Sequence, residues 1–333
     1  MPSRNASYTL FGWDFQVNAA IFIFLKNLKN IDKVRLEGKL QDVEFIKKDN
    51  SKIFAQAKSI YKYDDYTNVI SNLKSALKSL DEAQEKDPLC NEVIYVTNTP
   101  NPFNSDMGFF SGVTKTDYEG LPTSCKTIVD SIMIKDSLNS LNTQQFSIQV
   151  IPFHGDDLDN RYKYIKELVN ELLADLNLAG SGFAPSLLNV WHNEIFKNGT
   201  IPDTEIHIKK SELIWPLIFL VTDQASDEWL SQELDEDVYE EVKSKYRNII
   251  NNATDRFETY TKVVSDYRDY AFTGSNREKI KKFISESWDK YKSEIDTNNM
   301  LSDEEQEYVI KIVLHKIIVK KDYISRIKTG AGL

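Results

Sequence analysis

The feature that most constrains the fold is a pair of strand-like stretches, residues 41–46 and 52–57, that flank a short polar turn. The turn, Lys48-Asp49-Asn50-Ser51, has residue types that favour chain reversal, so the spacing predicts a β-hairpin. Because side chains alternate across a strand, Gln56 and Lys58 then point to the same face. A plain surface strand needs no particular polar residue there, so this face requires an explanation.

The two faces of the expected hairpin differ in chemistry. With the turn centred on Asn50, the pairing predicts Asp42 opposite Lys58 and Glu44 opposite Gln56, all on one face. A one-residue slip in the turn would move the acids to the opposite face. In the predicted register the other face is apolar and holds Val43, Phe45, Ile53 and Ala57.

The polar face carries the groups that a divalent cation needs for phosphodiester chemistry. Mg²⁺ prefers hard oxygen ligands, typically one or two carboxylates with water in the other positions. Glu37, at the end of the preceding strand, and Asp42 offer carboxylates, and the Gln56 amide or the Ala57 carbonyl offers a neutral oxygen. A bound Mg²⁺ neutralises phosphate charge and lowers the pKa of water. A lysine beside it, here Lys58, can hold the attacking water or stabilise the developing charge.

The segments around the hairpin predict an α/β domain. Apolar residues run nearly all round residues 13–28 and along one side of residues 65–84, and both patterns are typical of helices. Residues 92–97 have the β-branched and aromatic content of a strand. We therefore expect helices at residues 13–28, 65–84 and 158–178 and further strands at 33–36, 92–97 and 146–153. Residues 99–123 contain three prolines and three glycines and predict a loop.

The chain is long enough for two domains, at 333 residues. Gly180-Ser181-Gly182 is the best boundary and divides the chain into residues 1–180 and 181–333. Beyond it, residues 205–220 predict short strands, and an acidic region from residue 227 to about 327 predicts a mainly α-helical domain. Long helical patterns often bind partners, although a plain helical domain is the simpler interpretation.

Charge is unevenly distributed along a chain whose net charge is −10. Residues 1–62 hold 11 Lys and Arg against 6 Asp and Glu, a balance of +5, whereas residues 151–333 hold 24 against 33, a balance of −9. Local patches govern phosphate binding more than the global sum does, so the hairpin lies in the part best suited to a phosphate partner. A solvated surface with chance asymmetry is the alternative.

The cysteines and the apolar segments bear on the compartment. Cys90 and Cys125 have no metal-like spacing, and we expect unpaired thiols in a reducing environment. The N-terminal sequence lacks the shape of a signal peptide. The longest apolar run, residues 19–25, is far shorter than the ~20 residues of a membrane helix. We therefore expect a cytoplasmic protein without a membrane segment.

The pattern of motifs in the N-terminal part resembles the PD-(D/E)xK, or restriction-endonuclease-like, superfamily. The matching pieces are Gly12 and Phe15-Gln16 near the start of the first helix, VRLEG with Glu37, QDVEF with Asp42, and FAQAKS with Gln56 and Lys58. The pattern is most similar to the Q-x-K branch, the double-stranded-DNA endonuclease domains of bacterial anti-phage effectors of the CBASS and Lamassu kinds. The resemblance covers residues 8–100 and extends to about residue 175 through IQVIPF and HGDDL.

This resemblance implies a restriction-endonuclease-like αβββαβ core and cleavage of double-stranded DNA with Mg²⁺ or Mn²⁺ in phage defence. It assigns Asp42, Gln56 and Lys58 as the acid, amide and lysine of the motif, with Glu37 as a further acid. Glu37, Asp42 and Gln56 would be the metal ligands, and Gln16 would line the site. A glutamine replaces the usual second acid, so either metal affinity is weaker or Glu37 compensates as a ligand. No proline precedes Asp42, which is a second departure from the motif.

The expected macromolecular partners are DNA and a second protein. Candidates for contacts to the DNA backbone are Lys47, Lys48, Lys52 and Lys62, beside Gln16. The resemblance to Lamassu-type systems implies an SMC-like ATPase partner, and the acidity of residues 181–333 fits binding to protein rather than to DNA.

Three alternatives stay open at this point. The chain could be a catalytically inactive, nuclease-like adaptor in a defence complex, or a nuclease for RNA or single strands. The purely structural interpretation is a charged hairpin face exposed to water, with Asp42 and Lys58 as a weak cross-strand pair.

Two histidine motifs also admit a functional interpretation. His154-Gly155-Asp156-Asp157 follows an expected strand, but an aspartate that caps the next helix explains it better than a metal site does. His192 lies on an expected helix without a second histidine at ligand spacing. We expect structural roles for both.

Overall fold

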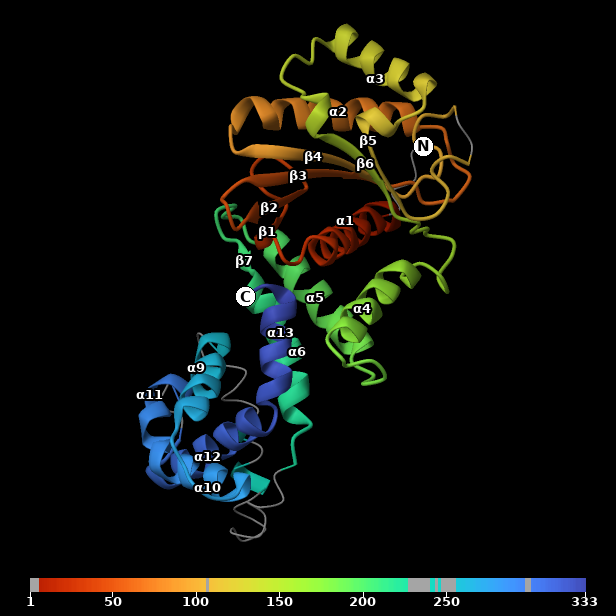
Figure 1. The fold of residues 1–333 in the computed structure, drawn as a ribbon. Coiled ribbons are helices and arrows are strands. Elements are labelled where there is room, and N and C mark those ends of the chain that lie inside the picture. The colour runs from red at the N-terminus through yellow and green to blue at the C-terminus, as the bar shows by residue number, and fades with distance from the viewer. Residues whose placement is uncertain (1–5, 106–107, 227–239, 243–244, 247–255, 297–300) are drawn as a thin grey trace. The chain divides into compact units, whose positions relative to one another are not determined.

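The computed structural model describes residues 6–105, 108–226, 240–242, 245–246, 256–296 and 301–333. The chain divides into two compact units, Met1–Leu213 and Ile214–Leu333. Figure 1 shows the helices and strands of each unit. The boundary therefore lies about thirty residues beyond the one predicted at residues 180–182.

The first unit is a mixed α/β domain, which confirms the expected class. It opens with α1 (Ser7–Lys26), β1 (Ile31–Leu36), β2 (Val43–Lys47), β3 (Lys52–Lys58), α2 (Val69–Lys86) and β4 (Cys90–Thr97), an αβββαβ order. The chain continues through β5 (Thr114–Asp117), α3 (Thr123–Asp136), β6 (Phe146–Val150), α4 (Lys163–Asp175), α5 (Ala184–Gly199), β7 (Ile208–Lys209) and α6 (Lys210–Asp223).

The strands form one sheet in the order β5-β6-β4-β3-β2-β1-β7. Most neighbouring pairs are antiparallel, but β3 pairs with β4, and β4 with β6, in parallel. Because β2 is antiparallel to both β1 and β3, the carboxyl ends of β1, β3, β4 and β6 lie at the same edge. We term this the carboxyl edge. The β2–β3 turn lies at the opposite edge.

Helices cover both faces of this sheet, with α2 on one face and α1 on the other (Figure 1). Phe54 of β3 and Tyr95 of β4 lie in a buried cluster with the apolar side of α2, represented by Leu73 and Leu77. The residues that alternate with them along each strand point to the opposite face of the sheet, the one that α1 covers, and they are also buried. Strands β3 and β4 are therefore buried on both sides. The expected amphipathic helix and buried strand therefore pack directly on each other.

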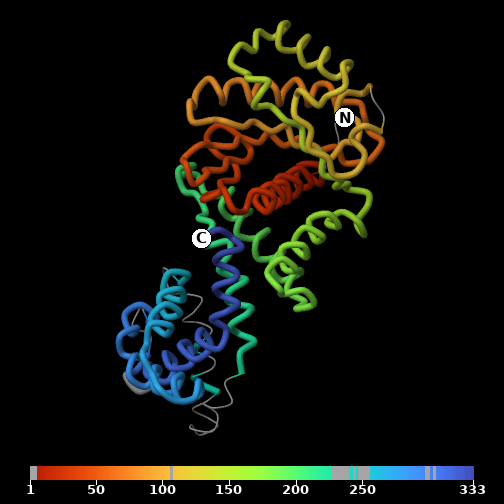
Figure 2. The backbone as a smooth tube through the Cα atoms, in the orientation of Figure 1, coloured from red at the N-terminus to blue at the C-terminus, as the bar shows by residue number. Residues whose placement is uncertain are grey.

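Helix α1 is apolar nearly all round because it is surrounded by protein. It is long and apolar enough to cross a membrane by length and composition alone. However, residues 17–24 are all buried, between the sheet and helices α4 and α5 (Figure 2). This is the burial pattern of a helix in a protein core.

The sequence analysis missed β5 and α3, which lie in or just after the segment interpreted as a loop. Strand β5 is a four-residue edge strand with the polar sequence TKTD, so it has no apolar signature. Helix α3 buries only Cys125 and Val129 and leaves Ile134 81% exposed, which blurs its periodicity.

Contacts to the sheet explain why the first unit extends beyond residue 180. Strand β7 pairs with β1. The buried Arg35 of β1 donates hydrogen bonds to the carbonyls of Asn198 (2.6 Å), Ile201 (2.6 Å) and Ile206 (3.2 Å), at and beyond the end of α5. A guanidinium group at a helix C-terminus satisfies carbonyls that lack a helical partner. Helix α5 and β7 are therefore integral to the first unit.

Every described element of the second unit is helical, as predicted for residues beyond 227. The short strands predicted at residues 205–220 are wrong except for the two-residue β7, because α6 occupies the rest of that segment. Besides most of α6, the described helices are α9 (Arg256–Asp269), α10 (Asn276–Ser287), α11 (Lys292–Ile295), α12 (Asp303–Val319) and α13 (Lys321–Ala331), with a short 3-10 helix at Trp288–Tyr291. Capping boxes begin α10, with Ser275 and Glu278, and α12, with Ser302 and Glu305. Most of the acidic run at the start of the predicted helical region lies outside the described residues.

Candidate active site

The β2–β3 hairpin forms, with a register two residues from the predicted one. Val43 lies opposite Ala55, and Glu44 opposite Phe54, so Asp42 lies beside Gln56 rather than Lys58. The turn centres on Asp49 because Asn50, with φ 66°, closes a three-residue loop in the left-handed region. Since the shift is even, the face assignments hold: Asp42, Glu44, Gln56 and Lys58 share one face.

Asp42 is fixed to β3 by its side chain. Its Oδ2 accepts hydrogen bonds from Gln56 Nε2 (2.5 Å) and from the backbone N–H of Ala57 (2.9 Å). Both bonds use the same oxygen, which leaves Oδ1 available for another partner. The carboxylate is therefore held in place with one oxygen still able to bind a cation.

Gln56 is buried, and both ends of its amide have protein partners. Its Nε2 donates to Asp42, and its Oε1 accepts from Ser79 Oγ of α2 (3.0 Å). Gln41 Nε2 also donates to the Ser79 carbonyl (2.7 Å). In this orientation the amide oxygen is turned away from the carboxylates. Gln56 thus orients Asp42, and the structure does not place it as the metal ligand that the sequence analysis expected.

Glu37 reaches the same place through the tight turn between β1 and β2. Its N–H donates to the Asp42 carbonyl (2.7 Å), and the N–H of Gly38 donates to the Gln41 carbonyl (2.9 Å). Glu37 has φ 51°, a left-handed conformation that is uncommon for residues other than glycine. Strained backbone of this kind concentrates at functional sites.

The electrostatics of Glu37 show which groups surround it. Burial raises the pKa of its carboxyl group, and the negative charge of Asp42 raises it further. A hydrogen bond from the Gln16 side chain of α1 and the positive charge of Lys58 oppose this shift. Gln16, Glu37, Asp42 and Lys58 therefore lie close enough to influence one another. We term these four residues the carboxylate cluster.

The carboxylate cluster fits a small, hard cation. Two carboxylates crowded together, one of them with a raised pKa, carry negative charge that a divalent cation would neutralise. Within the described part of the chain, no group of three or more His, Cys, Asp or Glu side chains is arranged to hold a metal. Mg²⁺ typically uses one or two carboxylates and completes its shell with water, so Glu37 and Asp42 suffice.

Glu44 shares the polar face but stabilises the turn. Its Oε1 accepts hydrogen bonds from the backbone N–H groups of Leu40 (2.6 Å) and Gln41 (3.1 Å). A Cβ at position 38 would lie 2.2 Å from the Glu44 carboxyl carbon, so a side chain there would displace the Glu44 carboxylate from these bonds. This packing fixes the segment that carries Glu37 and Asp42.

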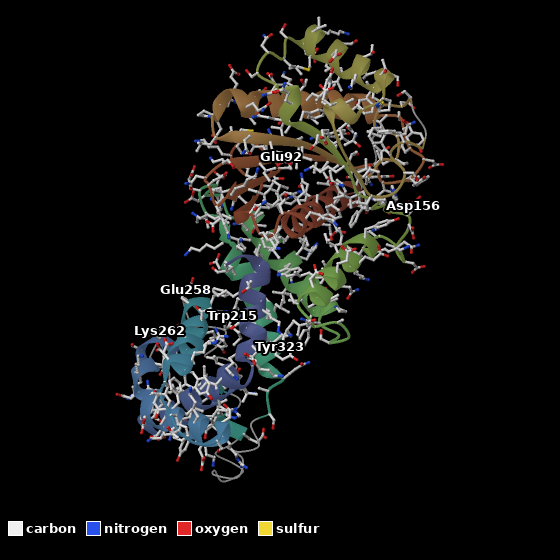
Figure 3. All side chains as sticks on the ribbon, in the orientation of Figure 1. Glu92, Asp156, Trp215, Glu258, Lys262 and Tyr323 are labelled. Carbon is white, nitrogen blue, oxygen red and sulfur yellow. The ribbon has the colours of Figure 1, made fainter. Side chains whose placement is uncertain are left out.

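The four lysines expected to contact DNA divide between the two edges of the sheet. Lys47, Lys48 and Lys52 lie around the β2–β3 turn, away from the carboxylate cluster. Lys47 lies 3.5 Å from a carboxylate oxygen of Glu92, and Lys52 lies 2.7 Å from one of Asp87. Figure 3 labels Glu92 in the sheet. Only Lys62, exposed in the loop after β3, lies at the carboxyl edge.

Sequence reasoning missed residues that reach the cluster from other elements. Ser79 and Gln41 set the amide of Gln56, and the exposed Lys39 lies in the turn beside Glu37. Ser79 borders the apolar side of an ordinary amphipathic helix, and nothing in its local pattern indicates a contact with β3. The order VRLEGKLQD could have singled out Lys39 as a cation beside the acids.

The two histidines differ in their contacts, and neither ring nitrogen of the buried His154 has a hydrogen-bond partner among the described residues. His154 is buried, its ring packs against Tyr63, and burial lowers its pKa. Asp157 accepts a bond from the N–H of Asn160 (3.2 Å) and so caps a turn before α4, not α4 itself. His192 Nε2 lies 3.0 Å from Asp14 Oδ1, which links α5 to α1.

Comparisons of the chain with protein-family models, curated proteins and solved structures gave no match. The functional argument therefore rests on the residues and their geometry.

Proposed function

We propose that the first unit is a Mg²⁺-dependent endonuclease for double-stranded DNA, of the PD-(D/E)xK, Q-x-K kind. The observation that carries this proposal is that the charges of Asp42 and Lys58 both act on the partly buried Glu37 carboxyl group, while Gln56 holds the Asp42 carboxylate. Two carboxylates and an ammonium group at the carboxyl edge are the groups that metal-assisted hydrolysis of a phosphodiester requires.

The order of elements supports this assignment. An acid stands just before β2, the Q-x-K sequence ends β3, and a helix on each side of the sheet contributes a residue to the site. Gln16 of α1 bonds Glu37, and Ser79 of α2 bonds Gln56. An αβββαβ order is what the resemblance leads us to expect, and the mixed α/β fold supports the proposal at that level.

Each residue has a role that follows from its contacts. Glu37 and Asp42 would hold Mg²⁺ or Mn²⁺, which supplies charge neutralisation and an activated water when bound. Gln56 keeps the Asp42 carboxylate directed at the site, and Gln16 does the same for Glu37. Lys58 holds the attacking water or stabilises the charge that develops on the phosphate. Lys39 and Lys62 are the exposed cations best placed to contact the DNA backbone.

We further propose that the chain is a cytoplasmic effector of bacterial defence against phages and acts with an SMC-like ATPase. This assignment rests on the resemblance to Lamassu-type effectors. The second unit is the natural docking element, because residues 214–333 hold 18 Lys and Arg against 23 Asp and Glu, a balance of −5 that disfavours DNA.

A catalytically inactive adaptor is the second candidate, and the orientation of Gln56 favours it. With the amide oxygen bonded to Ser79, only two side-chain ligands face the site. An adaptor would keep the fold and the partner surface without cleaving DNA.

A plasmid-cleavage assay on the full chain, alone and with its defence partners, separates the two candidates. We expect wild type to cut supercoiled plasmid with Mg²⁺ but not with EDTA, and Lys58→Ala to reduce the rate about 10²–10³-fold. Lys52→Ala is the matched control, because Lys52 pairs with Asp87 at the opposite edge, and it should cut like wild type.

Cutting by Lys58→Ala at the wild-type rate would exclude the assigned site, and no cleavage by the full complex would favour the adaptor. Single-stranded DNA and RNA substrates test the remaining alternatives.

A further inference from the structure

The second unit contains a cavity that the nuclease proposal does not use. It lies between α10 and α12, close to the loop that holds Phe272, and has a volume of about 640 Å³. This size falls within the range of small-ligand pockets, roughly 300–1,000 Å³. All its lining residues belong to the second unit.

Positive charge is concentrated in this cavity, although the unit as a whole is acidic. Its lining includes Arg277, Lys281, Lys282 and Lys311 but a single carboxylate, Glu278. Glu278 is already engaged, because its Oε2 accepts hydrogen bonds from the Ser275 N–H (2.9 Å) and Oγ (2.7 Å) in the capping box. These bonds lower the pKa of Glu278, so its charge stabilises the start of α10.

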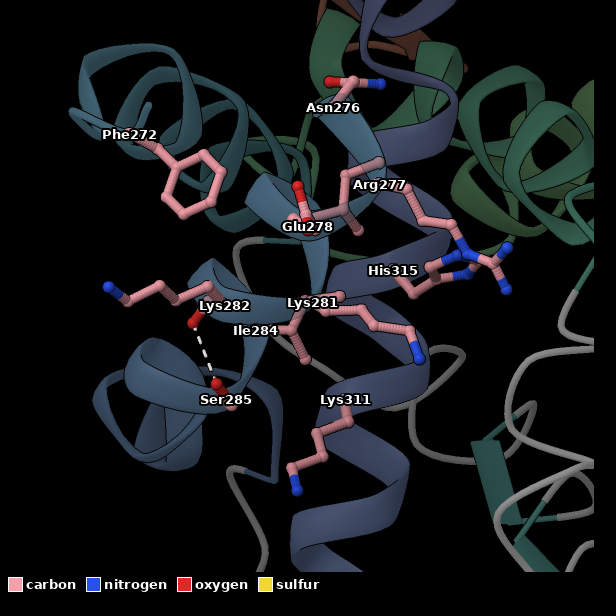
Figure 4. Close-up of a pocket in the computed structure, with 11 residues that line it drawn as sticks. Phe272, Asn276, Arg277, Glu278, Lys281, Lys282, Ile284, Ser285, Lys311 and His315 are labelled. Carbon is pink, nitrogen blue, oxygen red and sulfur yellow. Dashed lines mark hydrogen bonds between the residues drawn. The ribbon is translucent and has the colours of Figure 1, made fainter. Parts of the chain in front are cut away.

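The cations come from two facing helices at a regular spacing. Arg277 and Lys281 lie four residues apart on α10, and Lys311 and His315 lie four residues apart on α12. Residues at this spacing share one helix face. In Figure 4, Arg277 and Lys281 extend from α10 toward α12, whereas Lys282 extends in the opposite direction. The Lys282 ammonium lies 5.7 Å from the centroid of the Phe272 ring. Arg277 and Lys281 therefore lie on one side of α10, and α12 contributes Lys311 and His315 to the same lining.

Arg277 differs from most other basic residues of the unit. Lys245, Lys262 and Lys290 each form an ion pair with a carboxylate. Within the cavity lining, Lys282 pairs with Glu286 (3.8 Å) and Lys311 pairs with Glu307. Among the residues that the structure describes, no carboxylate lies within 4.0 Å of the Arg277 guanidinium, and its side chain is exposed. A planar guanidinium group without an acidic partner, at the mouth of a basic cavity, is suited to bind a phosphate through two parallel hydrogen bonds.

We propose that this cavity binds a small ligand that carries two or more phosphate groups, such as a nucleoside polyphosphate. Arg277 and Lys281 would contact one phosphate, and Lys311 would contact another by exchanging its partner Glu307 for the ligand. The cavity also has an apolar part, formed by Phe272, Ile280 and Ile284, and an aromatic ring there can stack on a base. The limited volume favours a small ligand over a duplex.

Binding of ATP and of inorganic triphosphate to the full chain, measured by calorimetry in low-salt buffer, tests this proposal. We expect both to bind wild type and both affinities to fall as salt rises. Arg277→Gln should weaken binding about ten- to a hundredfold, because it removes charge-assisted hydrogen bonds from an exposed position where the fold is not at risk. Lys290→Gln, outside the cavity, is the matched control and should bind like wild type.

The two ligands also separate the sources of affinity. Tighter binding of ATP than of triphosphate, lost in Phe272→Leu, would show that the cavity takes a nucleotide, whereas equal binding would show that it takes the phosphate chain alone. The proposal is overturned if neither ligand binds wild type, or if Arg277→Gln binds both as wild type does. It is also overturned if a short DNA duplex binds through Arg277 while the two small ligands do not.

Discussion

At the scale of single residues, Glu37 combines a strained backbone with an unfavourable charge. Its φ of 51° disfavours the folded backbone, and its raised pKa shows that the ionised carboxyl group is disfavoured in the folded state. Both effects arise from the turn that brings Glu37 to Asp42. Such local strain is tolerated where the surroundings enforce it, here through Glu44 and Gly38. In the proposed nuclease a bound cation would offset the unfavourable charge, because it attracts both carboxylates.

The pKa of Glu37 predicts how Glu37→Gln changes stability with pH. Because the folded-state pKa is raised, folding favours the protonated carboxyl, and that contribution is lost as pH rises through the folded pKa. Without metal, Glu37→Gln should therefore be more stable than wild type at pH 8 and nearly equal to it below the ordinary glutamate pKa of about 4.3. Urea unfolding at the two pH values measures this. A variant less stable at pH 8 would contradict the electrostatic account.

The orientation of Gln56 predicts an effect for a residue outside the cluster. Ser79→Ala removes the donor to Gln56 Oε1 and frees the amide to turn. We expect a loss of about 1 kcal/mol in the free energy of unfolding, with DNA cleavage reduced several-fold. Ser79→Thr retains the hydroxyl group and should keep most of the activity. If Ser79→Ala cleaves at the wild-type rate, Gln56 does not need this support.

At the scale of elements, the hairpin shows what sequence reasoning could and could not reach. Alternation fixed which side chains share a face, since the period of a strand is two. The register depends on which residue of the turn adopts the left-handed conformation, and in the structure this residue is Asn50. The composition of the turn does not decide between neighbouring positions. For the same reason, Asp42 and Lys58 were expected to pair directly, whereas Gln56 stands between them. Contacts from α2 to the site depend on tertiary packing and carry no local signal.

The hairpin loop makes a separate prediction about stability. Asn50→Ala places a residue with a Cβ and no polar side chain at φ 66°, which should cost about 1 kcal/mol of unfolding free energy. Asn50→Gly should be within a few tenths of wild type, since glycine adopts this conformation readily. Urea midpoints of the two variants measure the difference. Equal destabilisation by both would mean that the loop is held by side-chain contacts of Asn50 instead.

At the scale of the whole molecule, the extent of the first unit was the least predictable feature. The glycine-rich segment at residues 180–182 looks like a linker, yet α5 and the two-residue β7 beyond it return to the sheet. The long-range bonds from Arg35 to the end of α5 join residues more than 160 positions apart. No local pattern contains that information.

Truncation tests this boundary. A fragment of residues 1–213 should unfold cooperatively, because it keeps every partner of the sheet. A fragment of residues 1–180 leaves the buried Arg35 without its three carbonyl acceptors, which is a severe cost for a buried charge. We expect that fragment to be unfolded or aggregated by circular dichroism and gel filtration. Comparable stability of the two fragments would place the boundary at residue 180.

The location of a bound divalent ion tests the central claim most directly. A crystal of the full chain soaked in Mn²⁺ should show an anomalous peak between the Glu37 and Asp42 carboxylates, beside Lys58, and Asp42→Asn should abolish it. No peak there at saturating Mn²⁺, or a peak that survives in Asp42→Asn, would contradict the account.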